Sequence, residues 1–598
     1  MAEKGSYPSP IGGWNVRDSQ SLMAETDALV LDNFFPGDTE VSLRKGFSSH
    51  ATGLGSDVET LMTFDAGGSA KMWAAAGANI YEVTSSGAVG DAGVESLSNA
   101  RFQWTNISTS GGNFLWICNG ADAPRHYNGS AWATPSISGV TTTNIANVIV
   151  HKTRLFTCFN NSMVFGYLGV NAVAGTMAEF DLSSVFRLGG VLTAIGTWTR
   201  DGGSGADDLA VFITSNGEVA VYSGTDPSDA SKWSLVGVFK IGRPIGRRCF
   251  EKVGSDLIVI TDAGAVPLSQ VLQSGQSAPT TAISDKIAGA FKEASDANFS
   301  TFGWQVLLYP RGRYGLFNIP QGSSIFHQYV VNLTTGSWAR FTGQNAHCWV
   351  VFNGELYFGG SSGVVFKADT GTNDNTAAIE GIGKTAFNYF GQRGTQKQFT
   401  MIRPVMESDL SLSVSIGFDL DFAQGVDFYT PEAAPVLGAT WDEAAWDEEF
   451  WPIEGGNVVQ VWRSVNGIGY AAALRVKTST TAQNVKWHST DFIWPKLNVA
   501  ASIGDEITKE EAEQGLRDGV FSFFSRENSA AIVASYGDTL RIGVAGGDLD
   551  ELQDIEEEIC EYALQGGYTY IDIIGRVGWE RVLPDYERIA VVLRKQVQ

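Results

Sequence analysis

The sequence has little charge, cysteine or histidine, and no long apolar run. Charged residues make up only 18% of the 598 residues. No stretch of about 18 apolar residues could span a bilayer, and the N-terminus lacks the apolar region of a signal peptide. We therefore expect no stable membrane insertion. The five cysteines lack CxxC spacing, so we predict buried thiols in a chain that folds in a reducing cytoplasm. They are Cys118, Cys158, Cys249, Cys348 and Cys560.

The motifs that mark common enzyme sites are also missing. There is no GxSxG, HExxH or GxxxxGK[ST]. Propeller sialidases need an arginine cluster and a Tyr/Glu pair, whereas Ser223–Trp233 and Asn332–Trp338 contain only a related turn. We expect no catalytic residue, no cofactor and no metal site. The six histidines are spread singly and are interpreted as structural: His50, His126, His151, His327, His347 and His488.

The charge that is present is strongly acidic. The net charge is −24 and the pI is about 4.7. Proteins that bind nucleic acid tightly do so largely through lysine and arginine side chains, which displace counterions from the phosphates. Tight DNA binding across the surface is therefore excluded, whereas an acidic channel through which DNA slides is compatible with this composition. An ordinary solubilising charge is the alternative.

Glycine and aromatic residues are abundant and are arranged in short strand-turn-strand units. The chain has 69 glycines and 34 phenylalanines. Apolar strands are separated by tight turns such as Asn216-Gly217 and Asn353-Gly354, which suit the positive φ angles of hairpin turns. Such units follow one another loosely, without a fixed period, from Lys71 to Gly371. Radial packing of four-stranded units shields their edges, so we predict a β-propeller over residues 51–376, with a pair of β-sandwiches as the competing fold.

Changes in composition divide the rest of the chain. Residues 1–50 are predicted to be an extended N-terminal arm. After a polar break at Asp369–Thr376, residues 377–500 keep strand character without the blade pattern and are predicted to form a second β-domain. In its segment Thr440–Pro452, acidic residues alternate with three tryptophans. We interpret this segment as a loop whose aromatic side chains contact a neighbouring subunit. A calcium-binding loop is less favoured, because it needs a different spacing of ligand residues. These residues are Trp441, Trp446 and Trp451.

The sequence pattern of residues 501–598 predicts a separate α/β module. A helix with Thr508 as its cap is predicted over Ile507–Val520. A second helix is predicted over Leu549–Gly567, where Leu552, Ile555, Ile559 and Ala563 fall at helical spacing. Strand pairs surround it. The predicted fold is thus mainly β: a propeller, a second β-domain and a small C-terminal α/β domain.

Basic residues gather in two places. In a chain this acidic, such clusters either contact phosphate or pair with carboxylates of the same or a neighbouring subunit. We favour pairing and keep contact with DNA in a lumen as a hypothesis for the second cluster. The first cluster is Lys240, Arg243, Arg247, Arg248 and Lys252; the second is Lys384, Arg393, Lys397 and Arg403.

The N-terminal segment Gly12–Leu54 resembles the opening of a family of short-tailed bacteriophage (podovirus) tail proteins. The shared elements are GGxNxRD at Gly12–Asp18, LDNFFP at Leu31–Pro36 and LRKGF at Leu43–Phe47. Later segments of the chain also resemble this family, and together the set spans most of residues 1–495. They are ICNGADAPRHYNG, FNGELYFGGSSGVVFKADTG and RSVNGIGYAAALRVK.

This resemblance implies a structural virion protein: a tail tubular or nozzle subunit made in the host cytoplasm. Such subunits form a ring, generally six-fold, that lines or gates the DNA ejection channel during host entry. The implied partners are other copies of the chain, the tail adaptor and portal, double-stranded DNA that passes without tight binding, and tail fibres as further candidates. A receptor- or glycan-binding propeller at the virion surface is the alternative.

The C-terminal segment Tyr570–Val597 resembles the second half of an acetyltransferase-like (GNAT) fold. In that family a glycine-rich loop before a helix places backbone N–H groups on a pyrophosphate. Here Ile542–Asp548 reads IGVAGGD, and Val544 stands where the first glycine is expected. The departure implies a degenerate, non-catalytic module that serves for attachment.

Overall fold

The fold is described from a computed structural model. For the first two predicted domains and the arm, the described residues are 2–68, 70–201, 206–274, 282–409, 412–423, 457–459 and 462–495. For the C-terminal module they are 521–526, 530–536, 539–546, 549–566, 568, 570–574, 587–589 and 592–596. The loop with Trp441, Trp446 and Trp451 and the helix expected over Ile507–Val520 lie outside these residues.

Within the described residues, seven groups of antiparallel strands follow one another as the blades of a β-propeller; the sixth is part of a larger, nine-stranded sheet. In each of the first four blades the strands run in order from the inner strand outward. Blade 1 has β7 (Val58–Phe64), β8 (Lys71–Ala76) and β9 (Asn79–Glu82); blade 2 has β11 (Gln103–Thr109), β12 (Gly112–Cys118), β13 (Arg125–Tyr127) and β14 (Trp132–Ala133). Blade 3 has β16 (Ile145–His151), β17 (Arg154–Phe159), β18 (Val164–Tyr167) and β20 (Ala178–Asp181); blade 4 has β21 (Leu192–Asp201), β22 (Ala206–Thr214), β23 (Glu218–Gly224) and β24 (Trp233–Lys240).

The last three blades complete the ring. Blade 5 has β25 (Phe250–Val253), β26 (Asp256–Thr261) and β27 (Gly264–Pro267); blade 6 has β28 (Gln305–Tyr309), β29 (Tyr314–Pro320), β30 (Phe326–Asn332) and β31 (Trp338–Phe341). Blade 7 has β32 (Cys348–Phe352), β33 (Glu355–Gly359), β34 (Val365–Ala368) and β6 (Phe47–Thr52), with β10 (Gly87–Ala88) on its edge. The inner strands contact one another in a closed circle: β7, β11, β16, β21, β25, β28, β32 and β7 again.

The ring is closed by the N-terminal part of the chain. Strand β6 pairs antiparallel with β34, so blade 7 combines residues from both ends of the propeller. The Phe47 ring lies edge-on against Phe358 and Phe366, with centroids 5.1 Å apart in both pairs. The prediction of a propeller is confirmed, and the competing pair of β-sandwiches is not found for residues 51–376.

Hydrophobic side chains fill the spaces between neighbouring blades. Blades 1 and 2 share a core around Phe102 and Tyr127, and blades 3 and 4 share one around Phe165 and Phe212. Each blade buries its apolar face against the next blade. The alternating apolar residues are therefore buried between the blades, and no single central core is needed. The predicted hairpin turn at Asn353-Gly354 has positive φ at both residues, 51° and 75°, whereas in Asn216-Gly217 only Gly217 does.

The described residues between 377 and 495 form a second β-domain of two packed sheets, to which the N-terminal residues also contribute. One sheet has the order β38 (Asn457–Val459), β36 (Lys397–Ser408), β41 (Val485–Pro495), β5 (Val41–Leu43) and β4 (Phe34–Pro36), with β1 (Ala2–Pro8) on β41 and β39 (Arg463–Gly469) on β36. The other contains β3 (Asp27–Asp32), β35 (Ile379–Thr385), β40 (Ala472–Thr480) and β37 (Val414–Leu420), with β2 (Gly13–Trp14) on β3.

The structure differs from the expectation of an extended arm at residues 1–50. Five strands between Ala2 and Leu43 belong to the sheets of the second domain, and β6 belongs to blade 7. The reason is that strands of the propeller and of the second domain have unpaired backbone groups at their edges. The N-terminal segment pairs with these strands, although they lie far along the chain. β1, for example, pairs with β41 from Ala2↔Pro495 to Pro8↔Ser489.

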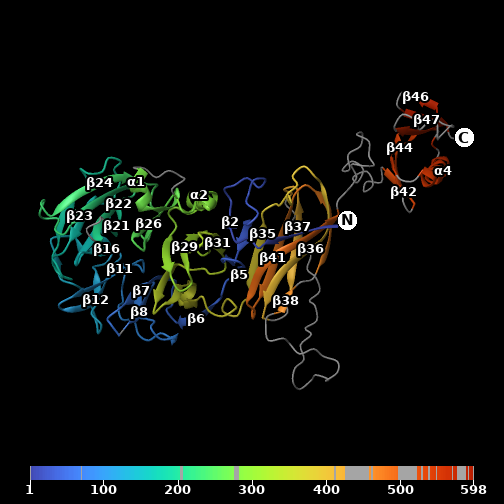
Figure 1. Ribbon diagram of the computed structural model, residues 1–598. Helices are drawn as coiled ribbons and strands as arrows, with labels where there is room; N and C mark the ends of the chain where they lie inside the picture. Colours follow the sequence, from blue (N-terminus) through green and yellow to red (C-terminus); the bar gives the residue numbers. More distant parts are fainter. Residues whose placement is uncertain are drawn as a thin grey trace, which may run out of the picture.

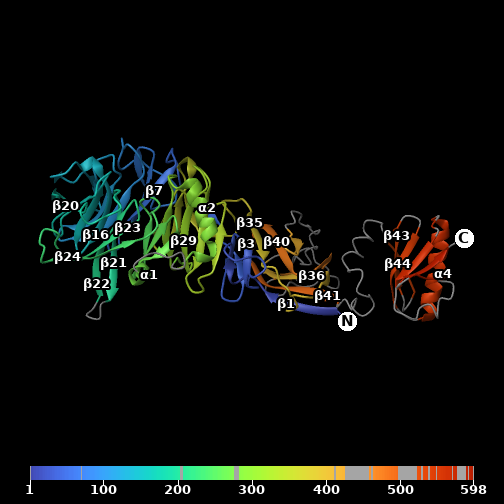
Figure 2. The same ribbon diagram turned by 90° about the horizontal axis from the view of Figure 1, so that it is seen from above.

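The propeller and the second domain share one sheet. β3 pairs parallel with β31 of blade 6 at Asp32↔Arg340 and antiparallel with β35 on its other side. Figures 1 and 2 show β2, β3 and β35 between the propeller and the remaining strands of the second domain. One hydrophobic core runs through this junction, from Trp338 and Phe317 of blade 6 to Trp487 and Phe492 of β41.

Helices and short connections complete the propeller. These are α1 (Leu268–Ser274), α2 (Ala288–Asn298), the 3-10 turns Thr142–Asn144, Asp285–Ile287 and Ser361–Gly363, and the pair β15 (Ile137–Ser138) with β19 (Gly175–Thr176). In the described part of the chain, no helix combines the length and the apolar character needed to cross a membrane.

The C-terminal module has a mixed sheet and one described helix. The sheet order is β42 (Phe521–Ser525), β43 (Ala530–Tyr536), β44 (Thr539–Gly546), β45 (Tyr570–Ile574), β47 (Val592–Gln596) and β46 (Glu587–Ile589). Helix α4 (Leu549–Gln565) connects the parallel strands β44 and β45 and buries Ile555, Ile559 and Ala563, as predicted. Residues 542–546 of the segment that resembles a cofactor loop lie in β44 itself.

The burial of the cysteines predicts how they react. Cys118, Cys158, Cys249 and Cys348 are buried free thiols, whereas Cys560 is half-buried. Burial raises the pKa of Cys249 and Cys348 to about 12, so little reactive thiolate forms near neutral pH. We expect a disulfide reagent to modify Cys560 first in the native protein and the other four only after denaturant is added. Fast native labelling of Cys348 would contradict the closed blade 7.

Candidate functional site

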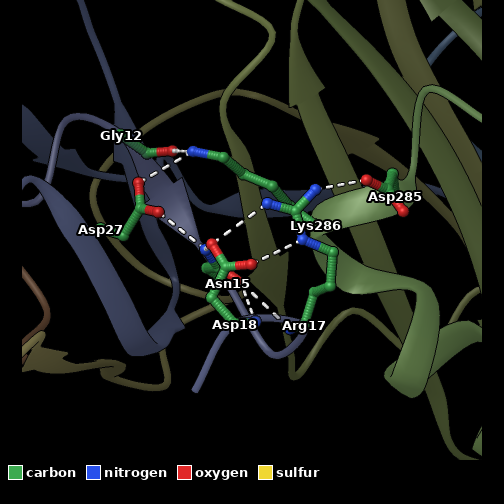
Figure 3. Close-up of polar contacts among 7 residues, drawn as sticks. All are labelled: Gly12, Asn15, Arg17, Asp18, Asp27, Asp285 and Lys286. Carbon is green, nitrogen blue, oxygen red and sulfur yellow. Dashed lines mark hydrogen bonds and ion pairs between the residues drawn. The ribbon is translucent and has the colours of Figure 1, made fainter. Parts of the chain in front are cut away.

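Polar side chains of the N-terminal motif GGxNxRD form hydrogen bonds at the joint between the propeller and the second domain. Asn15 donates from Nδ2 to Asp27 Oδ2 at 2.7 Å and to Asp18 Oδ2 at 2.9 Å. Lys286, from the propeller, donates to Asp27 Oδ1 at 2.8 Å and to the Gly12 carbonyl at 3.1 Å. Figure 3 shows both side chains meeting at Asp27, which is only 2% exposed.

A neighbouring ion pair ties the same segment to the propeller at the surface. Arg17 pairs with Asp285 and with Asp18. The Arg17 guanidinium and the Asn15 amide lower the pKa of Asp18 to about 2. Asp18 therefore remains ionised at physiological pH, and this corner of the joint keeps its ion pair.

The glycines of this segment are needed because the backbones approach closely. A side chain on Gly12 would place its Cβ 2.2 Å from Asp27 Oδ1. Gly13 has φ of +83°, and its Cβ would lie 2.6 Å from the Trp338 backbone. Both positions therefore exclude other residues. The GGxNxRD element is thus explained by the joint: glycines for close approach, then Asn15, Arg17 and Asp18 for the polar contacts.

The other two N-terminal motifs lie at the same joint. Asp32 of LDNFFP accepts two hydrogen bonds of 2.7 Å from Arg340 of blade 6. Arg44 of LRKGF, whose side chain is 2% exposed, donates to both carboxylate oxygens of Asp374 at 2.8 and 2.6 Å. It also donates to Asn33 and to the Thr342 carbonyl, each at 2.8 Å. Paired, planar contacts of this kind fix orientation as well as proximity.

A cavity of about 420 Å³ lies beside this joint. Its lining includes Asn15 and Asp18 of the first motif and Lys384 and Arg475 of the second domain. The two cations share one carboxylate: Lys384 Nζ lies 2.7 Å from Asp419 Oδ2 and Arg475 Nε lies 3.0 Å from Asp419 Oδ1. The Asp419 side chain is fully buried, and it neutralises one of the two positive charges inside the domain.

The second basic cluster, proposed as contacts to DNA in a lumen or to a neighbouring subunit, is largely engaged within the chain. Lys397 is 1% exposed and donates to the carbonyls of Gln392, Thr395 and Tyr470. Arg403 pairs with Asp491 at 2.5 Å and stacks over Trp462. With Lys384 held by Asp419, three of the four cations are engaged by partners within the chain. The remaining member, Arg393, is exposed on a loop and donates to the Ser21 carbonyl at 3.2 Å.

The first basic cluster contains two arginines that cross one mouth of the propeller channel. Arg248 lies just before β25 and donates to the Glu59 carbonyl, the Thr60 hydroxyl and the Phe102 carbonyl, in blades 1 and 2. Arg247 donates to the Ala146 carbonyl at 3.2 Å and to Asn160 Oδ1 at 2.5 Å, in blade 3. The segment before blade 5 is thus bound to three other blades across the ring.

Behind this closure lies a channel cavity of about 380 Å³, lined by residues of the inner strands. Its polar lining residues include Gln103, Asn147, Glu251 and Gln305. Burial raises the pKa of Glu251 to about 7. The cavity is of small-molecule size, so it offers no passage to a nucleic-acid duplex.

Charge and composition alone did not reveal these arrangements. The sequence marked Arg247 and Arg248 only as basic residues and did not mark Asn147 or Glu251. One sequence signal could have marked this cavity. It is a pair of adjacent arginines in an acidic chain, followed within three residues by a glutamate in a strand. Among the described residues, no group of three or more His, Cys, Asp or Glu side chains is arranged to hold a metal ion.

Comparison with known proteins gives only distant similarity. No protein-family model matches the chain, and no curated protein matches it. The structure of BBS1N in complex with ARL6DN is 13% identical over 38% of this chain and 73% of that chain, with a TM-score of 0.27. YCF48 bound to D1 peptide is 11% identical over 58% of this chain and 100% of that chain, with a TM-score of 0.33. YCF48 from Cyanidioschyzon merolae is 10% identical over 54% of this chain and 98% of that chain, with a TM-score of 0.26. Similarity at this level says nothing about function.

Removal of one buried charge tests whether the Arg44–Asp374 pair stabilises the joint. We expect Arg44→Met to lower the free energy of unfolding by about 3–5 kcal/mol, because Asp374 would be left without its cation. Arg311→Met is the matched control: the Arg311–Glu355 pair is exposed, and the expected loss is below about 1 kcal/mol. Urea unfolding followed by tryptophan fluorescence measures both. Equal effects of the two substitutions would show that the buried pair does not hold the joint.

Proposed function

We propose that this chain is a structural subunit of a short bacteriophage tail that assembles into a closed ring, a nozzle or tail tubular protein. The observation that carries the proposal is the sheet and the ion pairs that join the propeller to the second domain. All three N-terminal segments that resemble this family contribute buried contacts between the propeller and the second domain. A shared sheet with paired charges fixes the two bodies in one orientation, as a subunit of a closed ring requires.

In this proposal the second β-domain builds the tube and the propeller faces outward. The propeller channel supports this arrangement, because Arg247 and Arg248 cross its mouth and its cavity is far too small for DNA. DNA would pass through a pore between copies of the chain. The net charge of −24 fits a wall that repels phosphate rather than retaining it.

Because three cations of the second cluster are engaged within the chain, one residue remains as the proposed contact with DNA. Lys384, Lys397 and Arg403 are occupied by Asp419, by backbone carbonyls and by Asp491. Arg393 is exposed and remains the candidate for contact with DNA or a neighbouring subunit. Tail adaptor and portal proteins, with tail fibres as further candidates, are the partners that this role implies. The chain would carry out no catalysis.

Assembly of the purified full-length chain tests the proposal. We expect electron micrographs to show closed rings, and native mass measurement to give one multiple of the chain mass. Arg17→Ala combined with Lys286→Ala should reduce ring closure several-fold, because it removes two contacts that hold the N-terminal segment to the propeller. Lys292→Ala, which removes only the exposed Lys292–Asp296 pair, serves as the control and should assemble normally. A chain that stays monomeric under every assembly condition would refute the proposed role.

A further inference from the structure

The propeller channel has features of a ligand site that ring assembly does not need. Asn147 lies on the inner strand of blade 3, is 3% exposed and lines the channel cavity. Its side-chain oxygen is buried and accepts no hydrogen bond from the described residues. A buried acceptor without a donor is energetically unfavourable. A ligand hydroxyl would supply that donor.

The same cavity holds two guanidiniums that form no ion pair with a described carboxylate. Arg247 and Arg248 line it, and their hydrogen bonds go to backbone carbonyls, to a hydroxyl and to an amide oxygen. Burial lowers the pKa of both, as expected for positive charge that is poorly compensated. An anion bound in the cavity would compensate it.

The opposite charge in the cavity limits which anion fits. Glu251 is the carboxylate of the lining, and Arg247, Arg248 and Cys348 are the other titratable groups there. An ionised Glu251 repels an anion, and it repels a dianion such as phosphate more than a monoanion. The half-buried ring of Trp104 adds an apolar wall. The lining therefore favours a singly charged ligand with hydroxyl groups and a carbon skeleton.

We propose that the channel binds a small hydroxylated carboxylate, with its carboxylate toward Arg247 and Arg248 and a hydroxyl donating to Asn147. The cavity of about 380 Å³ has room for a molecule of this class. The site lies within one chain and does not depend on ring formation, so its failure and the failure of the proposed tail function can be told apart.

Calorimetric titration of the full-length chain with D-gluconate tests the site. We expect saturable 1:1 binding that is at least about tenfold tighter than that of D-glucose, which lacks the charge, of acetate, which lacks the hydroxyls, and of inorganic phosphate. Absence of saturable gluconate binding would mean that the cavity holds only water and would overturn the proposal. Equal binding of glucose, or tighter binding of phosphate, would also overturn it.

Two variants assign the binding to the channel. Asn147→Leu should weaken gluconate binding about tenfold, the loss of one hydrogen bond of about 1.4 kcal/mol. Asn106→Leu is the matched control: Asn106 lies on the neighbouring inner strand and donates to the Thr63 carbonyl but does not line this cavity, so binding should be unchanged. Unfolding curves for both variants establish that they are folded. Equal gluconate affinity in folded Asn147→Leu and wild type would contradict the assigned site.

The pH dependence provides a second, independent readout. In the wild type, gluconate affinity should fall as pH rises through about 7, because Glu251 becomes ionised and repels the ligand. In Glu251→Gln, which keeps the shape of the side chain, affinity should not change over the same pH range. An unchanged pH dependence in this variant would place the binding elsewhere in the molecule.

Discussion

The structure depends on one strand that hydrogen-bonds to two bodies at once. β3 continues blade 6 through Asp32 and begins the second domain through its pairing with β35. A carboxylate stands at each end of this strand, and each receives a cation from the propeller: Lys286 at Asp27 and Arg340 at Asp32. Because an uncompensated buried charge is costly, the two bodies have one favourable orientation.

Several basic residues of this acidic chain are engaged in internal contacts. Arg44, Lys384 and Arg403 pair with carboxylates, and Lys397 donates to backbone carbonyls. These positive charges therefore hold parts of the structure together. The same applies inside the propeller, where Arg247 and Arg248 connect the segment before blade 5 to the blades across the ring.

Local patterns in the sequence predicted the local structure well. The strand-turn-strand units, the Asn353-Gly354 hairpin and the helix that begins at Leu549 follow from alternation, turn chemistry and helical spacing. The blade count and the closure of the ring could not be predicted, because β6 pairs with a strand more than 300 residues later in the chain. The arm was misjudged for the same reason. Asp27 and Asp32 look like exposed ends of a short strand until Lys286 and Arg340 are placed beside them.

The candidate site was predicted in part. The N-terminal motifs were recognised through their resemblance, but their physical role at the joint emerged only from the contacts of Gly12, Asn15 and Arg44. The second basic cluster was identified by charge alone, and charge does not reveal a buried partner such as Asp419 or Asp491. Asn147 and Glu251 carry no sequence signal of their own, because their environment is created by the other blades.

Hydrogen–deuterium exchange across β3 tests the central claim most directly. The amide of Asn33 donates to the Arg340 carbonyl at 2.8 Å, and the amide of Ala386 donates to the Asp27 carbonyl at 3.0 Å. If the joint is a rigid part of one sheet, these amides should exchange as slowly as those of β29 and β30 inside blade 6. Exchange at Asn33 and Ala386 as fast as in surface loops, with β29 and β30 still protected, would show that the propeller and the second domain move independently.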